Sequence, residues 1–434
     1  MRGLRSLIVL LVIAIPLGWY ALYESKHPAS GEKTQEKVFA DVKSDAIDQV
    51  IVKSTSGDRT TVAKKDNTWQ VTQPIAVKAD EAELSGITSN LASLEVQRVV
   101  DDQATDFKQY SLDPARIEVT FRAGGKDRTL LVGQKTPTGS DLYARLPDKA
   151  RVFLIPSYLE TTFNRSTFDL RDKTVLAFDR DKVDHVTVTD AKQTIALAKQ
   201  GADWRLTSPV DARADFSAVE GLVGRINTAQ MKAITANEAT DLKQYGLDKP
   251  EMTITLAAGS STASLAIGKS AGEGVVYAKD ASRPLVFTID SAVADEMKKP
   301  ADDFRQKDLF DARSFNTTRI EVVRNGQTRA FERSGDKWKQ VAPSAKDVDA
   351  TKVDALMSAL TNTRATGFVD DTANTGLDKP ELSVTLKYEE GQKTEHVAFG
   401  KHASDAFAQR QGDKGAAKIG AASLDAILKA LDGI

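Results

Sequence analysis

The chain repeats one short phrase three times, as Lys108-Gln-Tyr-Ser-Leu-Asp-Pro114, Lys243-Gln-Tyr-Gly-Leu-Asp-Lys-Pro250 and Asn374-Thr-Gly-Leu-Asp-Lys-Pro380. The leucine of the phrase is residue 112, then 247, then 377, so the step is 135 residues and then 130. Because this period is much longer than the unit of a solenoid, each copy predicts a small domain with its own core. The phrase therefore predicts three tandem domains.

The sequence before each copy of the phrase repeats as well. A strand-like stretch contains a tryptophan five residues before a proline, and an aspartate then precedes apolar residues at helical spacing. After the first such aspartate, Leu84, Ile87, Leu91 and Leu94 make one apolar stripe on a helix that the aspartate caps. The repeated tryptophans are Trp69, Trp204 and Trp338, and the repeated caps are Asp80, Asp215 and Asp349. We predict buried tryptophans and one capped helix in each repeat.

The sequence after each copy alternates apolar and polar residues, as strands do. Ile117, Val119 and Phe121 form the first such run, and the run after it is predicted to end at a glycine. The matching glycines are Gly133, Gly268 and Gly400. Each repeat is therefore predicted to be a small α+β domain, mainly an antiparallel sheet packed by one capped amphipathic helix. The predicted ranges of the repeats are 41–174, 175–310 and 311–434.

The aspartate of the phrase admits two interpretations. As chemistry, Asp113, Asp248 and Asp378 would be a repeated ligand or acid. As structure, each would accept hydrogen bonds from nearby backbone amides in a turn, before a proline that starts a strand. We favour the turn. The position before the leucine of the phrase is expected to have a positive φ, because it is glycine at Gly246 and Gly376; in the first copy it is a serine.

Composition narrows the classes of function. A chain of 434 residues, 41% hydrophobic and 28% charged, suits about three globular domains. The chain has 59 Lys and Arg residues against 61 Asp and Glu residues, so it lacks the excess of positive charge that is typical of nucleic-acid-binding proteins. The absence of cysteine excludes disulfides, thiolate metal sites and thiol catalysis. His396 and His402 have a spacing that fits no common metal pattern, so they are predicted to be exposed loop residues.

The amino-terminal segment predicts a membrane anchor. Residues 7–23 carry no charge and would span about 26 Å as a helix, enough for a bilayer core. Basic residues before the segment and aromatic residues at its far end fit a cytoplasmic stub at 1–6 and an interfacial aromatic belt. A cleaved signal peptide is the alternative, although Ala29-Ser-Gly31 is a poor cleavage site. Residues 24–40 predict a polar linker, and the bulk of the chain is expected outside the cytoplasm.

The sequence contains no recognisable catalytic motif. The acidic pairs Asp101-Asp102 and Asp370-Asp371 stand at matching points and could bind a cation weakly, but solvated loops are the favoured interpretation. No nucleophile, base and orienting group come together, so we predict neither an enzyme nor a cofactor. A hydrolase would need a polar pocket between repeats. A glycan-binding module would need the three tryptophans to form an exposed stacking row.

These features together resemble a bacterial family catalogued as domain of unknown function 4340. The resemblance rests on the anchor, the tryptophan–proline strand ends, the connector Phe304-Arg-Gln-Lys307 and, most specifically, Gln244-Tyr-Gly-Leu-Asp-Lys-Pro250. It extends from about Val38 to the end of the chain. Ser111 and the missing tyrosine of the third copy depart from the pattern. Family members are typically encoded beside ABC-type transporter components of the kind linked to gliding motility.

The resemblance implies a non-enzymatic accessory or scaffold protein of an envelope transport complex. Such a protein would cross the bacterial inner membrane once through residues 7–23, with its amino terminus in the cytoplasm and its repeats in the periplasm or another extracytoplasmic space. Its expected partners are proteins of that complex. A glycan or peptidoglycan binding module is the alternative function, followed by a hydrolase with a site between repeats.

Overall fold

The computed structural model describes residues 36–434. The predicted stub at 1–6 and the predicted anchor at 7–23 lie outside the described residues, as does most of the predicted linker at 24–40. Within residues 36–434, no helix is long and apolar enough to cross a bilayer.

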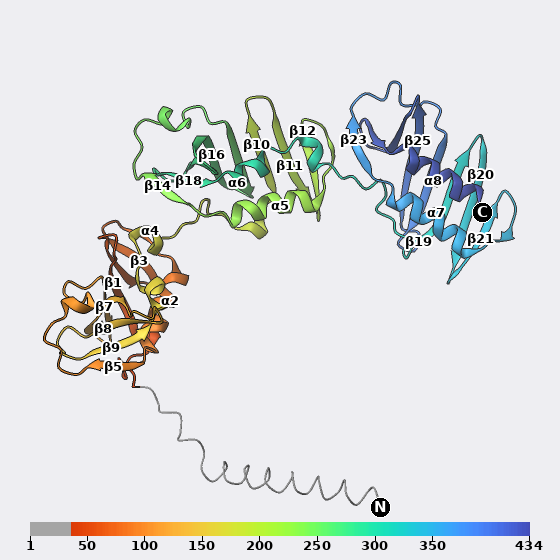
Figure 1. Ribbon diagram of the computed structural model, residues 1–434. Helices are drawn as coiled ribbons and strands as arrows, with labels where there is room; N and C mark the ends of the chain where they lie inside the picture. Colours follow the sequence, from red (N-terminus) through yellow and green to blue (C-terminus); the bar gives the residue numbers. More distant parts are fainter. Residues whose placement is uncertain (1–35) are drawn as a thin grey trace, which may run out of the picture. The chain divides into compact units, whose positions relative to one another are not determined.

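Three antiparallel sheets of nine strands each make up the described chain (Figure 1), and all three have the same strand order. The first sheet runs β4-β3-β2-β1-β6-β7-β8-β9-β5. Its strands are β1 (Ile47–Lys53), β2 (Arg59–Lys65), β3 (Thr68–Gln73), β4 (Val77–Lys78), β5 (Arg98–Asp101), β6 (Ile117–Ala123), β7 (Lys126–Lys135), β8 (Asp141–Arg145) and β9 (Val152–Pro156). The tandem α+β architecture predicted from the phrase is confirmed.

The other two sheets repeat this order with their own strands. The second consists of β10 (His185–Asp190), β11 (Thr194–Gln200), β12 (Asp203–Ser208), β13 (Ala212–Arg213), β14 (Ala233–Ala236), β15 (Met252–Ala258), β16 (Ser261–Gly272), β17 (Val275–Asp280) and β18 (Val286–Asp290). The third consists of β19 (Thr317–Arg324), β20 (Gln327–Ser334), β21 (Lys337–Ala342), β22 (Lys346–Asp347), β23 (Ala365–Val369), β24 (Leu382–Tyr388), β25 (Lys393–His402), β26 (Asp405–Arg410) and β27 (Ala416–Ile419).

One helix connects the two edges of each sheet. These helices are α2 (Glu81–Ala92), α5 (Phe216–Asn227) and α7 (Ala350–Asn362). In the first repeat α2 follows the edge strand β4 and leads to β5 at the opposite edge, so the helix crosses one face of the sheet. The chain then returns to the middle, where β6 pairs with β1. The crossing helix covers the face on which the main core forms.

Each crossing helix begins at its predicted cap. The side chains of Asp80, Asp215 and Asp349 accept hydrogen bonds from backbone amides two or three residues further on. Such bonds satisfy amides that the first turn of a helix leaves without partners, and each is worth about 1 kcal/mol.

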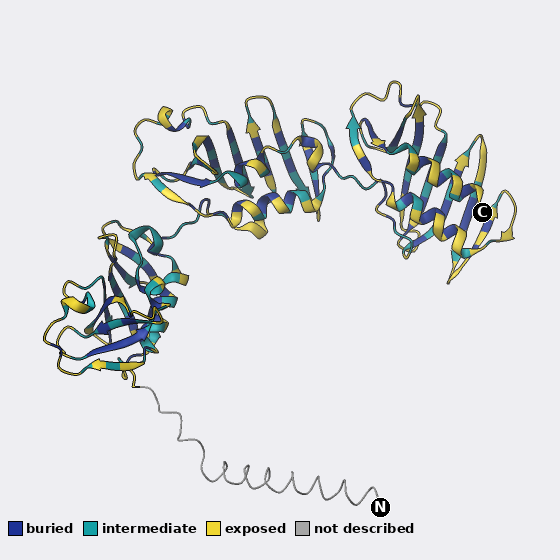
Figure 2. Ribbon diagram, viewed as in Figure 1, coloured by how far each residue is buried: buried dark blue, intermediate teal, exposed yellow. Residues whose placement is uncertain are grey.

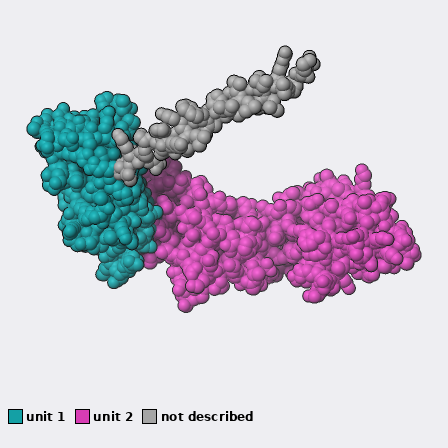
Figure 3. Space-filling model, turned by 90° about the horizontal axis from the view of Figure 1, so that it is seen from below, with its two compact units in different colours: residues 1–173 teal, residues 174–434 magenta. Residues whose placement is uncertain are grey.

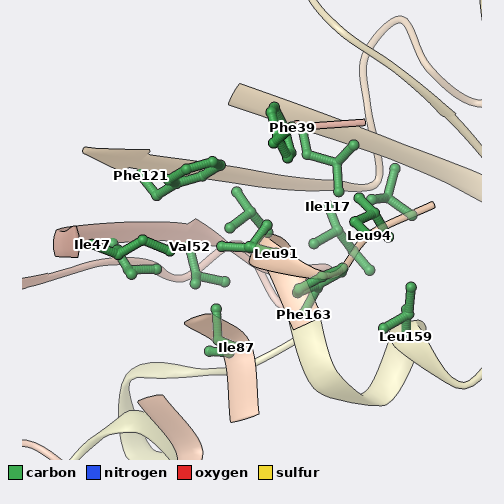
Figure 4. Close-up of a cluster of buried hydrophobic side chains, with 14 of the residues drawn as sticks. Phe39, Ile47, Val52, Ile87, Leu91, Leu94, Ile117, Phe121, Leu159 and Phe163 are labelled. Atoms are coloured by element: carbon green, nitrogen blue, oxygen red, sulfur yellow. The ribbon is translucent and has the colours of Figure 1, made fainter. Parts of the chain in front are cut away.

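The apolar stripe of the helix packs against alternate residues of the strands. Figure 4 shows this core in the first repeat, where Ile87 and Leu91 of α2 gather with Ile117 and Phe121 of β6. Each of these four side chains is at most 1% exposed. Leu94 is also buried, although it lies beyond the last residue of the helix. Figure 2 shows the same alternation of buried and exposed residues along the strands of the other sheets.

The third repeat closes differently from the first two. After its last strand the first repeat has two short helices, α3 (Leu159–Phe163) and α4 (Thr167–Leu170), and the second has α6 (Ser291–Met297). The third has the longer helix α8 (Ala421–Asp432), which contacts α7. Leu424, Ile427 and Leu431 of α8 are buried. This helix was not among the elements predicted from the sequence.

By compactness the chain divides into two units, one ending at Lys173 and one beginning at Thr174 (Figure 3). The first unit holds the first sheet, and the second unit holds the other two. The first folded repeat begins before residue 41, because Phe39 packs in its core. The third repeat begins before residue 311, because Phe310 packs in the core of the third sheet.

Candidate functional site

The repeated phrase forms a turn that lies directly on a glycine of a neighbouring strand. A Cβ added to Gly133 would stand 2.1 Å from the carbonyl oxygen of Tyr110, and one added to Gly268 would stand 2.2 Å from that of Tyr245. On Gly400 it would lie 2.5 Å from a carbonyl oxygen of the third turn. Only glycine permits this approach of two backbones. The glycines lie inside β7, β16 and β25, so the prediction that they end strands is wrong.

The turn covers the sheet face opposite the main core. Leu131 packs with the turn, whereas its neighbours Leu130 and Val132 pack in the main core, and successive strand residues point to opposite faces. The tyrosine of the turn packs on a tyrosine of the next strand, with ring centroids 4.9 Å apart for Tyr110 and Tyr143. The corresponding distance in the second repeat is 5.1 Å. The phrase therefore gives the first and second sheets a second, smaller core.

The position before the leucine has the predicted backbone conformation in all three turns. Its φ is 68° at Gly246, 73° at Gly376 and 55° at Ser111. Ser111 adopts this left-handed conformation without being glycine, and its hydroxyl lies 3.2 Å from the Oε1 atom of Gln134.

The aspartates of the phrase do not bond the local backbone. In the described structure Asp113, Asp248 and Asp378 are exposed and their carboxylates make no hydrogen bond, so this prediction is wrong. The bonded aspartate stands seven residues earlier in every repeat. Asp106, Asp241 and Asp371 accept hydrogen bonds from the amide two residues later, at 2.9, 2.9 and 2.8 Å. Their carboxylates start the turn, whereas those of the phrase point into solvent.

Replacing the two kinds of aspartate should have different effects on stability. We expect Asp241→Ala to lower the free energy of unfolding by about 1 kcal/mol, the usual cost of a lost capping bond. Asp248→Ala should change it by less than about 0.5 kcal/mol, as is usual for an exposed residue without partners. Urea unfolding of the two variants measures the difference, and equal losses would contradict the assignment.

The three repeated tryptophans are buried, with 5%, 3% and 2% of their surface exposed. A cation from the paired neighbouring strand lies over each ring. The pairs are Lys64–Trp69 at 5.1 Å from the ring centroid, Lys199–Trp204 at 5.2 Å and Arg333–Trp338 at 5.9 Å. Because the rings are both buried and covered, they form no exposed row for stacking a sugar.

The histidines and acidic pairs do not assemble a metal site. His396 and His402 were predicted to be exposed loop residues, but both lie in β25, so the loop prediction is wrong. The Nδ1 atom of His396 is 2.9 Å from a threonine hydroxyl. Asp101 accepts a hydrogen bond from a backbone amide, and Asp370 faces Arg305 at 3.6 Å. No group of three metal-binding side chains occurs in the part of the chain that the structure describes.

The connector between the second and third sheets is held at both ends. The backbone of Arg305 pairs with Ala214 beside the second sheet, and that of Asp308 pairs with Arg364 beside the third. The guanidinium of Arg305 is buried and lies 3.8 Å from the ring centroid of Phe368 in β23. Only two residues separate the two backbone pairings, so the free part of the connector is short.

A buried carboxylate holds the start of the third repeat. The side chain of Glu395 is 1% exposed and accepts hydrogen bonds from the amide of Asp311 at 3.0 Å and from the Tyr388 hydroxyl at 2.9 Å. It also accepts one from Nη2 of Arg410 at 3.1 Å and one from the amide of Ala312 at 3.3 Å. Burial and the hydrogen bond to Glu395 raise the pKa of Tyr388, so this phenol stays neutral.

Asp311 joins two arginines that come from different repeats. Its Oδ1 lies 3.0 Å from Nη1 of Arg213 in the second repeat, and its Oδ2 lies 2.9 Å from Nη1 of Arg410 in the third. Burial alone would raise the pKa of Asp311, but the two guanidiniums lower it below its ordinary value. Burial and the neighbouring Arg410 lower the pKa of Arg213. Asp311 therefore separates two cations that would otherwise repel each other.

A polar cleft of about 240 Å³ opens beside this cluster, with Trp204, Arg205, Gln306 and Asp311 among its walls. Its two arginines are paired, Arg205 with Asp211 and Arg213 with Asp311. Among the described residues that line the cleft, no nucleophilic side chain lies next to a side chain that could act as its base. What the arrangement does is hold two sheets together. This cluster could not be predicted from the sequence, because its members are spread from residue 213 to residue 410 and form no local motif.

Comparison with known proteins gives one family. A family model described as "Domain of unknown function (DUF4340)" matches residues 69–203 and 204–380, so each match begins at one of the repeated tryptophans. No curated protein matches the chain. Among solved structures, the DNA polymerase III subunit beta from Pseudomonas aeruginosa aligns over 88% of this chain and 93% of that one, at 7% identity. The TM-score of 0.16 is too low to carry a structural argument.

Proposed function

The chain belongs to the family described as domain of unknown function DUF4340, and we propose that it is a non-enzymatic, membrane-anchored scaffold protein of an envelope transport complex. In this proposal residues 7–23 cross the bacterial inner membrane once. The amino terminus lies in the cytoplasm, and the three sheets lie in the periplasm or another extracytoplasmic space.

The repetition of one sheet carries the proposal. Three sheets of the same strand order each bring their own core and their own surface, which suits a protein that holds several partners. The connector between the second and third sheets pairs by its backbone with both repeats, and Asp311 beside it forms ion pairs with Arg213 and Arg410. Catalysis of acyl or glycosyl transfer needs an activated nucleophile or a poised acid and base, whereas these paired charges favour a structural role.

Crosslinking in membranes tests the scaffold function. The full chain, carrying an affinity tag after Ile434, is crosslinked mildly in cells, purified from detergent and analysed by mass spectrometry. We expect integral membrane components of a transporter to be captured, and a chain lacking residues 1–35 to lose them when the membrane fraction is isolated. Capture of no membrane-complex component by the anchored chain would count decisively against the proposal.

A further inference from the structure

The charged cluster at the connector between the second and third sheets, which is called the second connector below, consists of Arg213, Asp311, Glu395 and Arg410. The second repeat does not have the same charges at the positions that match Glu395 and Arg410. Glu395 pairs across its strands with Leu386, and the residue that pairs with the matching Leu256 is Ala263. Val397 and Leu265 are equivalent, because each stands three residues before the repeated glycine. Val397 pairs with Arg410 in the third repeat, and Leu265 pairs with Asp280 in the second. The second repeat therefore has an alanine and an acid where the third has a buried acid and an arginine.

The connectors differ in the same way. Arg171 and Arg305 are the matching first anchors, because each pairs by its backbone with the residue before the capping aspartate of its own repeat. Counting six residues on from each gives Ala177 and Asp311.

In the first repeat the positions that match Asp311 and Glu395 hold Asp41 and Arg128, which form an ion pair of their own. The combination of Asp311, Glu395 and Arg410 thus occurs only in the second connector and the third repeat. A feature that the fold itself required would recur with the fold, so this cluster serves the one junction where it occurs.

We propose that four charged residues form an ionic latch that fixes the third sheet to the second, with Asp311 as its central residue. Neutralising the carboxylate of Asp311 frees the third sheet to move about the connector. The latch consists of Arg213, Asp311, Glu395 and Arg410. Its geometry is directional: Glu395 holds the backbone of Asp311 on the third sheet, and the carboxylate of Asp311 reaches out to Arg213 of the second.

Asp311 is the weak point of this arrangement because it alone links the two arginines. Arg213 is 23% and Arg410 is 18% exposed, so solvent screens them poorly once the shared carboxylate is lost. An asparagine at 311 would remove the one carboxylate that both guanidiniums contact. Arg410 would keep its hydrogen bond to Glu395, whereas Arg213 would keep only the carbonyl oxygen of Asp308 as a hydrogen-bond acceptor. The carboxylate of Asp413, 3.9 Å from Nε of Arg213, is too far away to replace a direct hydrogen bond. Repulsion then acts across the junction.

Distance measurement between spin labels tests the latch. The chain has no cysteine, so Ser260→Cys and Gln392→Cys place one label on an exposed hairpin of the second sheet and one on an exposed hairpin of the third. In the full chain we expect a narrow distance distribution, and we expect Asp311→Asn to widen it at least twofold. Raising the salt concentration to about 1 M, where the screening length is about 3 Å, should widen it in the unsubstituted latch.

The matched control is Asp405→Asn, which removes an ion pair with Lys418 inside the third repeat, 3.0 Å apart in the structure, and should leave the distribution unchanged. Arg213→Gln breaks the latch from the second repeat without altering the third, so it should widen the distribution as Asp311→Asn does. A pair of labels at Lys352→Cys and Gln392→Cys, both in the third repeat, should stay narrow in every variant. An unchanged width between the sheets in Arg213→Gln overturns the proposal, whatever Asp311→Asn shows.

Discussion

Replacing Glu395 with alanine is expected to destabilise the third repeat by about 3–5 kcal/mol, the usual cost of removing one partner of a buried charged network. The substitution leaves the Tyr388 hydroxyl and the guanidinium of Arg410 without their carboxylate, and the amides of Asp311 and Ala312 without their acceptor. Each buried polar group without a partner carries a desolvation cost. Urea unfolding, with hydrogen exchange to localise the loss to residues 311–434, measures the effect.

The informative control is Glu395→Gln. The amide oxygen can still accept from the backbone of Asp311, but the negative charge opposite Arg410 is gone, so we expect a smaller loss than with alanine. Tyr388→Phe removes a single hydrogen bond and should cost about 1 kcal/mol. If Glu395→Ala lost no more stability than Tyr388→Phe, the carboxylate would not be the centre of the network.

Local patterns of the sequence were sufficient to predict the repeat and most of its longer elements. The alternation at Ile117, Val119 and Phe121 and the caps at Asp80, Asp215 and Asp349 depend on residues within one element, so they can be read without knowing the fold. The edge strands β5, β14 and β23 were missed, because strands of four or five residues with half-exposed side chains carry little periodic signal. Helix α8 was also missed, although Leu424, Ile427 and Leu431 have helical spacing in the sequence.

The junction could not be predicted in the same way. Arg213, Asp311, Glu395 and Arg410 meet only because one connector and three strands bring them together, and nothing in the sequence around each of them marks it as more than an ordinary surface charge. The aspartates show a subtler limit. The repeated phrase predicted that Asp248 bonds the turn. Asp241 recurs at the same period, and it is the residue that accepts the hydrogen bond from a backbone amide of the turn. Repetition within the chain indicates that a position matters to the fold, but it does not indicate which of two repeated aspartates makes the contact.

The glycine beneath each turn gives the second large prediction, and it concerns the phrase itself. Gly268→Ala places a Cβ 2.2 Å from the carbonyl oxygen of Tyr245 and 3.1 Å from Cγ of Leu247. The closest of these atoms belongs to the backbone, so rotation of a side chain cannot relieve the clash. We expect the turn to lift from the sheet, at a cost of about 2–3 kcal/mol, typical of overpacking a closed site. Hydrogen exchange should rise in residues 241–250 while α5 stays protected.

A second glycine of the same repeat separates this steric effect from the general effect of adding a methyl group. Gly221 lies in the middle of α5, and a Cβ added there would meet nothing within 4 Å. Gly221→Ala should therefore raise the free energy of unfolding by about 0.5–1 kcal/mol, because alanine loses less backbone entropy in a helix than glycine does. The same chemical change thus has opposite signs at two positions of one repeat. If Gly268→Ala were neutral, the close contact of the turn and the strand would not exist, and the repeated phrase would have lost its structural explanation.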